Sequence, residues 1–96
     1  MEPRLIHIDA KVKRTIEKAS DWYIENRNRQ FAKTMLRNFA KTIETTAAMP
    51  TIGKVYKTIN GIEYRSIVAH KGSIIYYHYT DTDIYFDSIV FTRNNP

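Results

Sequence analysis

The sequence predicts an α+β fold in which a short strand and two helices precede three or four antiparallel strands. Two observations predict it. Apolar residues between about residues 11 and 48 recur every three or four positions, as on one face of a helix. After Pro50 the chain becomes rich in Ile, Val and Tyr, with turn-forming residues at regular intervals. A length of 96 residues suits one domain, so we expect residues 1–96 to form a single unit.

The first helix is expected from Lys11 to about Asn26, after a short β-prone run, Leu5 to Ile8. Asp9 precedes it and suits the N-cap position, because its carboxylate can accept the free N–H groups of a first helical turn. The helix is amphipathic, with an apolar stripe formed by Val12, Ile16, Ala19 and Tyr23.

The second helix is expected from about Arg29 to just before Pro50, after the polar segment 26–29. Pro50 ends it because the proline ring disfavours helical conformation in the residue before it. The polar segment is short, so the two helices should form an αα-hairpin. The apolar stripe of the second helix consists of Ala32, Leu36, Phe39 and Ile43.

The remaining chain reads as an antiparallel meander covered on one face by the helices. Asn60-Gly61 is a strong hairpin signal because both residues tolerate positive φ. Turns are also expected at 70–72 and 80–83. In the last strand the alternation predicts that Ile84, Phe86 and Val90 share one face, and Tyr85, Ile89 and Phe91 the other. The expected strands are Val55 to Ile59, Ile62 to Ala69, Ser73 to Tyr79 and Ile84 to Phe91.

Positive charge is concentrated in the helical part. Up to Lys57 there are 12 basic and 6 acidic residues, and after it 3 basic and 4 acidic, so the net charges are +6 and −1. Such a field favours an anionic partner, either nucleic acid or an acidic protein segment. The chain has no cysteine, which excludes disulfides and thiolate chemistry, and no run long enough to span a membrane. We therefore expect a cytoplasmic protein that has no membrane partner.

A few residues of the strands are candidates for chemistry. Arg65 lies in an apolar strand, so it should face solvent, pair with Glu63 or Asp87, or bind a phosphate. Tyr77 lies on the opposite side of its strand from His78, which can act as a general acid or base near neutral pH. The three histidines have no metal-binding spacing, and no phosphate-binding glycine loop occurs, so we expect no metal and no cofactor.

Several short motifs, in this order, resemble the RelE/ParE superfamily of toxins from type II toxin-antitoxin systems. The resemblance covers nearly the whole chain and is fairly specific only for the motifs taken together. It implies a small α+β fold and a cognate antitoxin that wraps around the toxin. The motifs are Asp-Trp-Tyr at 21–23, Met-Pro-Thr-Ile-Gly at 49–53, Tyr-Arg-Ser-Ile at 64–67, Ile-Ile-Tyr-Tyr at 74–77 and Phe-Thr-Arg-Asn-Asn-Pro at 91–96.

The superfamily implies two activities, inhibition of DNA gyrase by ParE-like toxins and ribosome-dependent mRNA cleavage by RelE-like toxins. For target or nucleic-acid binding, the resemblance implies Lys54, Lys57, Arg65 and Arg93. In a nuclease, Arg65 and Arg93 would act with Tyr77 or His78. The position before Arg93 holds Phe91-Thr92, where nuclease members tend to have a histidine or tyrosine. We therefore favour the ParE branch, with the nuclease and an inactive, antitoxin-binding homologue as alternatives; whether the chain is an enzyme stays open.

Overall fold

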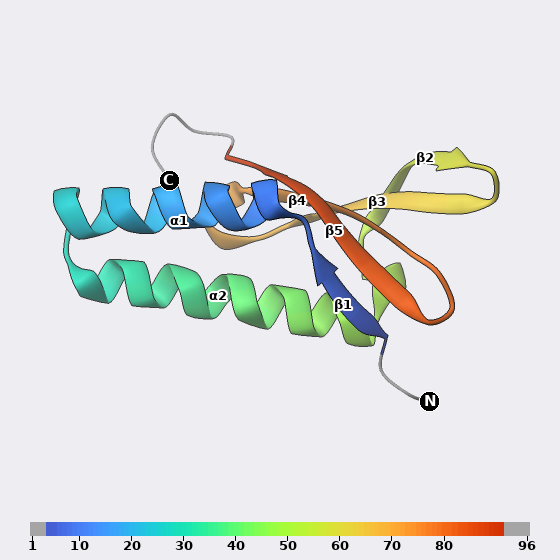
Figure 1. Ribbon diagram of the computed structural model, residues 1–96, viewed down its shortest axis with the longest axis horizontal. Helices are drawn as coiled ribbons and strands as arrows, with labels where there is room; N and C mark the ends of the chain where they lie inside the picture. Colours follow the sequence, from blue (N-terminus) through green and yellow to red (C-terminus); the bar gives the residue numbers. More distant parts are fainter. Residues whose placement is uncertain (1–3, 92–96) are drawn as a thin grey trace.

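The computed structural model describes residues 4–91, which form a helical hairpin beside a five-stranded sheet (Figure 1). The α+β class and the order of elements are confirmed. In chain order the elements are β1 (Leu5–Ile8), α1 (Ala10–Asn26), α2 (Arg29–Ala48), the 3₁₀ turn η1 (Pro50–Ile52), β2 (Lys54–Ile59), β3 (Ile62–Val68), the 3₁₀ turn η2 (His70–Gly72), β4 (Ile74–Tyr79) and β5 (Asp83–Val90).

Both helices begin at a side-chain cap. The Asp9 carboxylate accepts a hydrogen bond from the Lys11 backbone N–H at 2.8 Å. The Asn28 side-chain oxygen accepts one from the Phe31 N–H at 3.1 Å. These caps satisfy donors that have no partner inside the helix, and Asn28 at the same time ends the short connection between the helices.

The sheet is mixed, with strand order β1-β5-β4-β3-β2. Strands β2 to β5 form the expected antiparallel meander, whereas β1 pairs in parallel with β5. Asn60 and Gly61 have φ of 51° and 79°, the left-handed conformation that the hairpin requires. The β2–β3 hairpin extends beyond the end of the helices at the right of Figure 1.

The core lies between the helical hairpin and one face of the sheet. From the sheet, Ile75, Tyr77, Ile84 and Phe86 are fully buried. Because side chains alternate along a strand, the residues between them point to the opposite face, which no helix covers. The helices contribute Val12, Ala19, Tyr23, Ala32, Met35, Phe39, Ile43 and Ala47.

A β-bulge in β5 changes the faces expected for its last residues. Tyr76 pairs with Ser88 and Tyr77 with Phe86, so Asp87 is an extra residue in β5. An extra residue reverses the alternation beyond it. Ile89 is therefore buried together with Phe86, and Val90 is 48% exposed, the reverse of the expected placement.

Candidate functional site

The uncovered face of the sheet carries a row of side chains that crosses all five strands. The members are direct partners in register, so they lie side by side on the same face. We call this set the cross-sheet row; from β1 to β2 it consists of His7, Tyr85, His78, Tyr64 and Lys57.

The rings of the row cover one another's faces. Tyr85 lies between His7 and His78, with centroids 4.5 and 4.8 Å away and nearly parallel planes. His78 also contacts the Tyr64 ring at 4.7 Å, and the Lys57 ammonium lies 4.9 Å from the Tyr64 centroid. A base needs a free ring face to stack on, so this arrangement disfavours base stacking. It leaves ring edges, hydroxyls and ring nitrogens for a partner.

Both histidines of the row contact a carboxylate. His78 Nδ1 lies 2.7 Å from Asp87 Oδ2, and the bulge in β5 places Asp87 beside this ring. His7 Nε2 lies 2.7 Å from Asp83 Oδ1. A carboxylate at one ring nitrogen fixes the orientation of an imidazole.

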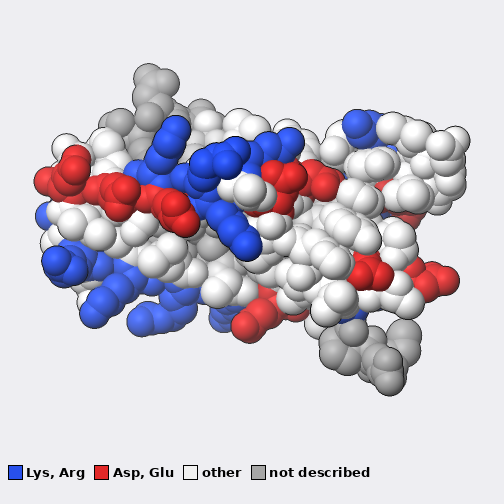
Figure 2. All heavy atoms as spheres, viewed as in Figure 1, with Lys and Arg blue, Asp and Glu red and all other residues white. Residues whose placement is uncertain are grey.

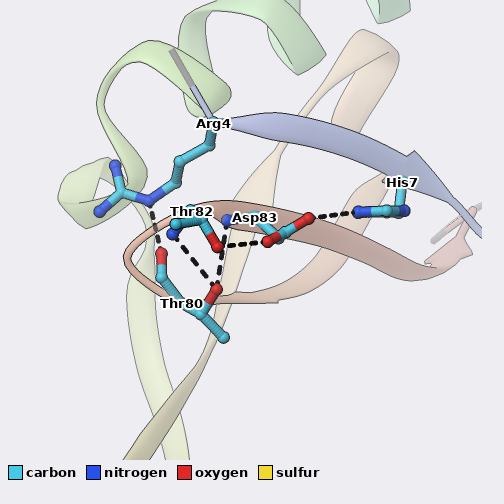
Figure 3. A network of polar contacts seen from close by, with 5 residues as sticks. All are labelled: Arg4, His7, Thr80, Thr82 and Asp83. Atoms are coloured by element: carbon cyan, nitrogen blue, oxygen red, sulfur yellow. Dashed lines mark hydrogen bonds and ion pairs between the residues drawn. The ribbon is translucent and has the colours of Figure 1, made fainter. Parts of the chain in front are cut away.

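Asp83 belongs to a polar network at the corner between β4, β5 and β1 (Figure 3). The Thr82 hydroxyl donates to the Asp83 carboxylate, and Thr80 Oγ1 accepts from the Asp83 N–H at 3.1 Å. Arg4 Nε donates to the Thr80 carbonyl at 2.7 Å. The hydrogen bond from Thr82, followed by that with His7, lowers the pKa of Asp83, so its carboxylate is charged at neutral pH.

A second bulge places two cations at the β2 end of this face. Val55 pairs with Arg65 and Lys57 with Tyr64, so Tyr56 is an extra residue in β2. Lys54 and Lys57, three positions apart, therefore both lie on the uncovered face. The Tyr56 ring contacts the Tyr76 ring at 5.2 Å on the same face.

Arg65 and Tyr77 lie on the opposite face, paired with each other in register. The Arg65 guanidinium donates to the Thr51 carbonyl at 3.1 Å and to the Gly53 carbonyl at 2.6 Å. It also contacts Glu63 Oε1 at 2.7 Å, so of the two alternative partners expected from the sequence, Glu63 and Asp87, the ion pair forms with Glu63. Arg65 thus ties the segment between α2 and β2 to the sheet.

The Tyr77 hydroxyl is buried and holds the same segment. It donates to the Pro50 carbonyl at 2.6 Å and accepts from the Gly53 N–H at 3.0 Å. A Cβ at Gly53 would lie 2.5 Å from this hydroxyl and 2.6 Å from the Ser66 carbonyl, so only glycine fits there. Burial raises the pKa of Tyr77, which keeps the phenol protonated.

The structure therefore brings together only part of the predicted site. Lys54, Lys57 and His78 share the uncovered face, whereas Arg65 and Tyr77 lie on the other. Arg93 lies outside the described residues. The sequence reasoning missed Tyr64, Tyr85 and Asp87 as neighbours of His78. It also missed His7 and Asp83, which bond each other beside Tyr85. Their period-two spacing was visible, but the strand register that aligns them was not.

Two further features bear on the site. Among residues 4–91, no three His, Asp or Glu side chains are grouped so that they could hold a metal ion. Within the same residues, no helix has the length and apolar character needed to cross a membrane.

The model of the family described as the ParE toxin of the type II toxin-antitoxin system, parDE, matches residues 6–94. The chain belongs to the ParE toxin family. It is thus the toxin component of a type II toxin-antitoxin system, and its partner is a cognate antitoxin.

A solved ParDE structure shares the fold of this ParE-family toxin. It is described as "Chromosomal ParDE TA system from P. aeruginosa"; the match has a TM-score of 0.72 and covers 90% of this chain and 92% of that chain. The sequences are 10% identical, so the likeness concerns the fold. No curated protein sequence matched the toxin.

Proposed function

We propose that this ParE-family toxin inhibits DNA gyrase by binding it through the uncovered face of the sheet. The observation that carries the proposal is that the residues expected for a nuclease lie on opposite faces of the sheet. Arg65 and Tyr77 are engaged in structural contacts on the helix side, whereas His78 lies on the other face. Among the described residues, the nuclease set inferred from the resemblance thus has no shared position for a scissile phosphate.

The cross-sheet row has the composition of a protein-binding surface. Tyrosine and histidine offer an apolar ring and a polar edge, and tyrosine is enriched among residues that dominate binding energy. The rings support one another, and aspartates orient both histidines, so little side-chain entropy remains to be lost on binding. Gyrase as the target would place the site of action in the cytoplasm.

We propose that the antitoxin covers a separate apolar strip. Met49, Ile52 and Val55 follow one another from the end of α2 through η1 into β2, with exposures of 60, 49 and 43%. Exposed apolar residues that recur along one short segment are typical of a surface that a partner covers. The strip spans residues 50–53, whose backbone Arg65 and Tyr77 hold by hydrogen bonds.

The test is a supercoiling assay with purified gyrase and purified toxin. The parent toxin should inhibit supercoiling, and Tyr64→Ala and Tyr85→Ala should each weaken inhibition by about tenfold or more, as expected for central interface residues. Ile24→Ala, which removes an exposed apolar side chain from α1, is the matched control and should inhibit like the parent. Unchanged supercoiling at high excess of folded parent toxin would contradict the proposal.

A ribosome-dependent nuclease is the second candidate, because one observation favours it. Asp87 orients His78, and Tyr64 and Tyr85 flank it, with Lys57 beyond Tyr64. An oriented imidazole can take the proton of a ribose 2′-OH while a cation stabilises the phosphate. Programmed ribosomes would then yield cut mRNA with the parent and intact mRNA with His78→Gln.

The third candidate is an inactive homologue that only binds antitoxin. Controlled expression in a bacterial host without antitoxin separates it from the other two. Growth arrest would eliminate the inactive homologue, and plasmid topology and mRNA integrity, followed in the same cells, would distinguish gyrase inhibition from mRNA cleavage.

A further inference from the structure

The outward side of α2 carries an unbroken line of cations. Arg29, Lys33, Arg37 and Lys41 are four residues apart, and all are exposed. Four residues advance a helix by about 6 Å, so the line spans about 18 Å. We call these residues the α2 cation line. Figure 2 shows it as blue side chains along the lower edge of the molecule, where Figure 1 places α2.

No described residue neutralises the α2 cation line. The three ion pairs among residues 4–91 lie elsewhere, and none of the four cations makes a side-chain hydrogen bond to a described residue. Glu44 is the sole acid of α2, near its end. By contrast, α1 mixes both signs, with pairs such as Lys13 and Glu17 four residues apart.

The α2 cation line opposes helix formation. Like charges four residues apart repel each other, and three such pairs follow one another here. Arg29 also occupies the first position of α2, at the positive end of the helix dipole, and the first turn holds no acid. Helix stability therefore does not explain the pattern, whereas neutralisation by an anionic partner does.

The residues between the cations indicate which anionic partner fits. An acidic protein helix needs an apolar stripe on the surface it binds. On the outward side of α2 the neighbours of the cations are Gln30, Thr34, Ala40 and, beyond Lys41, Glu44; the exposed Phe31 and Leu36 lie on the flanks. A surface that is mainly cationic and polar, without a continuous apolar stripe between the cations, suits a phosphate backbone, which contributes charge and hydrogen-bond acceptors without apolar groups.

We propose that the α2 cation line binds the phosphate backbone of double-stranded DNA without sequence preference. The choice of DNA among polyanions rests on the proposed gyrase target, whose substrate is duplex DNA. The contact orients the toxin on that DNA while the uncovered sheet face, built from other elements, stays available for protein.

Binding of a labelled 20-base-pair DNA duplex of mixed sequence, without gyrase, tests the proposal. Fluorescence anisotropy between 50 and 200 mM KCl gives the dependence of log K on log salt. Neutralising four phosphates predicts a slope of about −3.6. Lys33→Gln with Arg37→Gln should reduce it to about −1.8 and weaken binding at least tenfold at 100 mM KCl.

The matched control is Lys13→Gln with Lys18→Gln, which removes the same net charge from exposed positions of α1. It should leave the slope within about 0.5 of the parent. Circular dichroism checks that both variants fold; for the α2 variant, the relief of like-charge repulsion favours folding. If the two variants lost equal DNA affinity, the toxin would be attracted to DNA by its net charge alone, and the proposal would be overturned.

Three other results would also overturn it. They are no binding by the parent, binding of an RNA duplex of the same length at least tenfold tighter than DNA, and displacement of DNA by polyglutamate at equal charge concentration. The last would point to an acidic protein partner. Because this assay contains no gyrase, its outcome is independent of the supercoiling assay, and either proposal can fail alone.

Discussion

Tyr76, Tyr77 and His78 show how neighbouring residues acquire different roles. Tyr77 is fully buried, and its hydroxyl bonds two backbone groups, while Tyr76 and His78 lie on the uncovered face. The alternation of a strand separates them into a structural residue and two surface residues. A tyrosine that resembled a catalytic residue in the sequence is therefore explained by the two main-chain groups it satisfies.

Tyr77→Phe should lower the free energy of unfolding by about 1–3 kcal/mol, because the Gly53 N–H and the Pro50 carbonyl lose a buried partner. Urea denaturation measures the change. Tyr85→Phe, which removes a hydroxyl from the uncovered face, is the control and should change stability by less than about 0.5 kcal/mol. Equal effects of the two substitutions would contradict the role assigned to the Tyr77 hydroxyl.

At the scale of elements, the sequence predicted where helices and strands lie but not how the strands align. The helices begin at their capping residues, α2 ends just before Pro50, and the turn at Asn60-Gly61 forms, because these signals are local. The bulges at Tyr56 and Asp87 depend on the partner strand. Val90 was therefore assigned to the wrong face, and the pairing of His78 with Asp87 was missed.

The corner where β5 meets β1 should make stability depend on pH. The folded pKa of Asp83 is lowered by its hydrogen bonds to Thr82 and His7. A lowered carboxyl pKa stabilises the folded state above the unfolded pKa of about 3.8, and this contribution is lost as pH falls through the folded pKa. In urea titrations from pH 6 to pH 2, Asp83→Asn should show a smaller loss of stability than the parent.

Glu17→Gln removes an exposed carboxyl of α1 and serves as the control for that titration. It should follow the parent curve. If the stability of Asp83→Asn fell between pH 6 and pH 2 as steeply as that of the parent, the network at this corner would contribute nothing to acid sensitivity.

At the scale of the whole molecule, the two faces of the sheet have different roles. The helix side holds the core, with Phe86 and Ile84 fully buried, while the other side carries the cross-sheet row. Of two residues adjacent in a strand, one therefore stabilises the core and the other belongs to the surface proposed to bind a partner. The two faces should respond differently to truncation of neighbouring aromatic residues.

Phe86→Ala should reduce the free energy of unfolding by about 3–5 kcal/mol, because it leaves a cavity in the core. Tyr85→Ala removes two ring contacts on the uncovered face and should cost about 1–2 kcal/mol. Thermal or urea unfolding of both variants gives the comparison. If Tyr85→Ala were as damaging as Phe86→Ala, the uncovered face would be part of the core rather than a free surface.

The parallel pairing of β1 with β5 has a consequence for synthesis of the toxin. Leu5 to Ile8 pair with Asp83 to Phe86. The strand that is synthesised first therefore has no pairing partner until the last strand has been synthesised. A contact between residues so far apart in the chain carries a larger loop-closure entropy cost than a local one, so we expect it to form late. His7 and Tyr85, which stack on the uncovered face, come from these two strands. A nascent chain that stops before β5 therefore lacks this surface, so on the proposed function a fragment from interrupted translation should not bind the target.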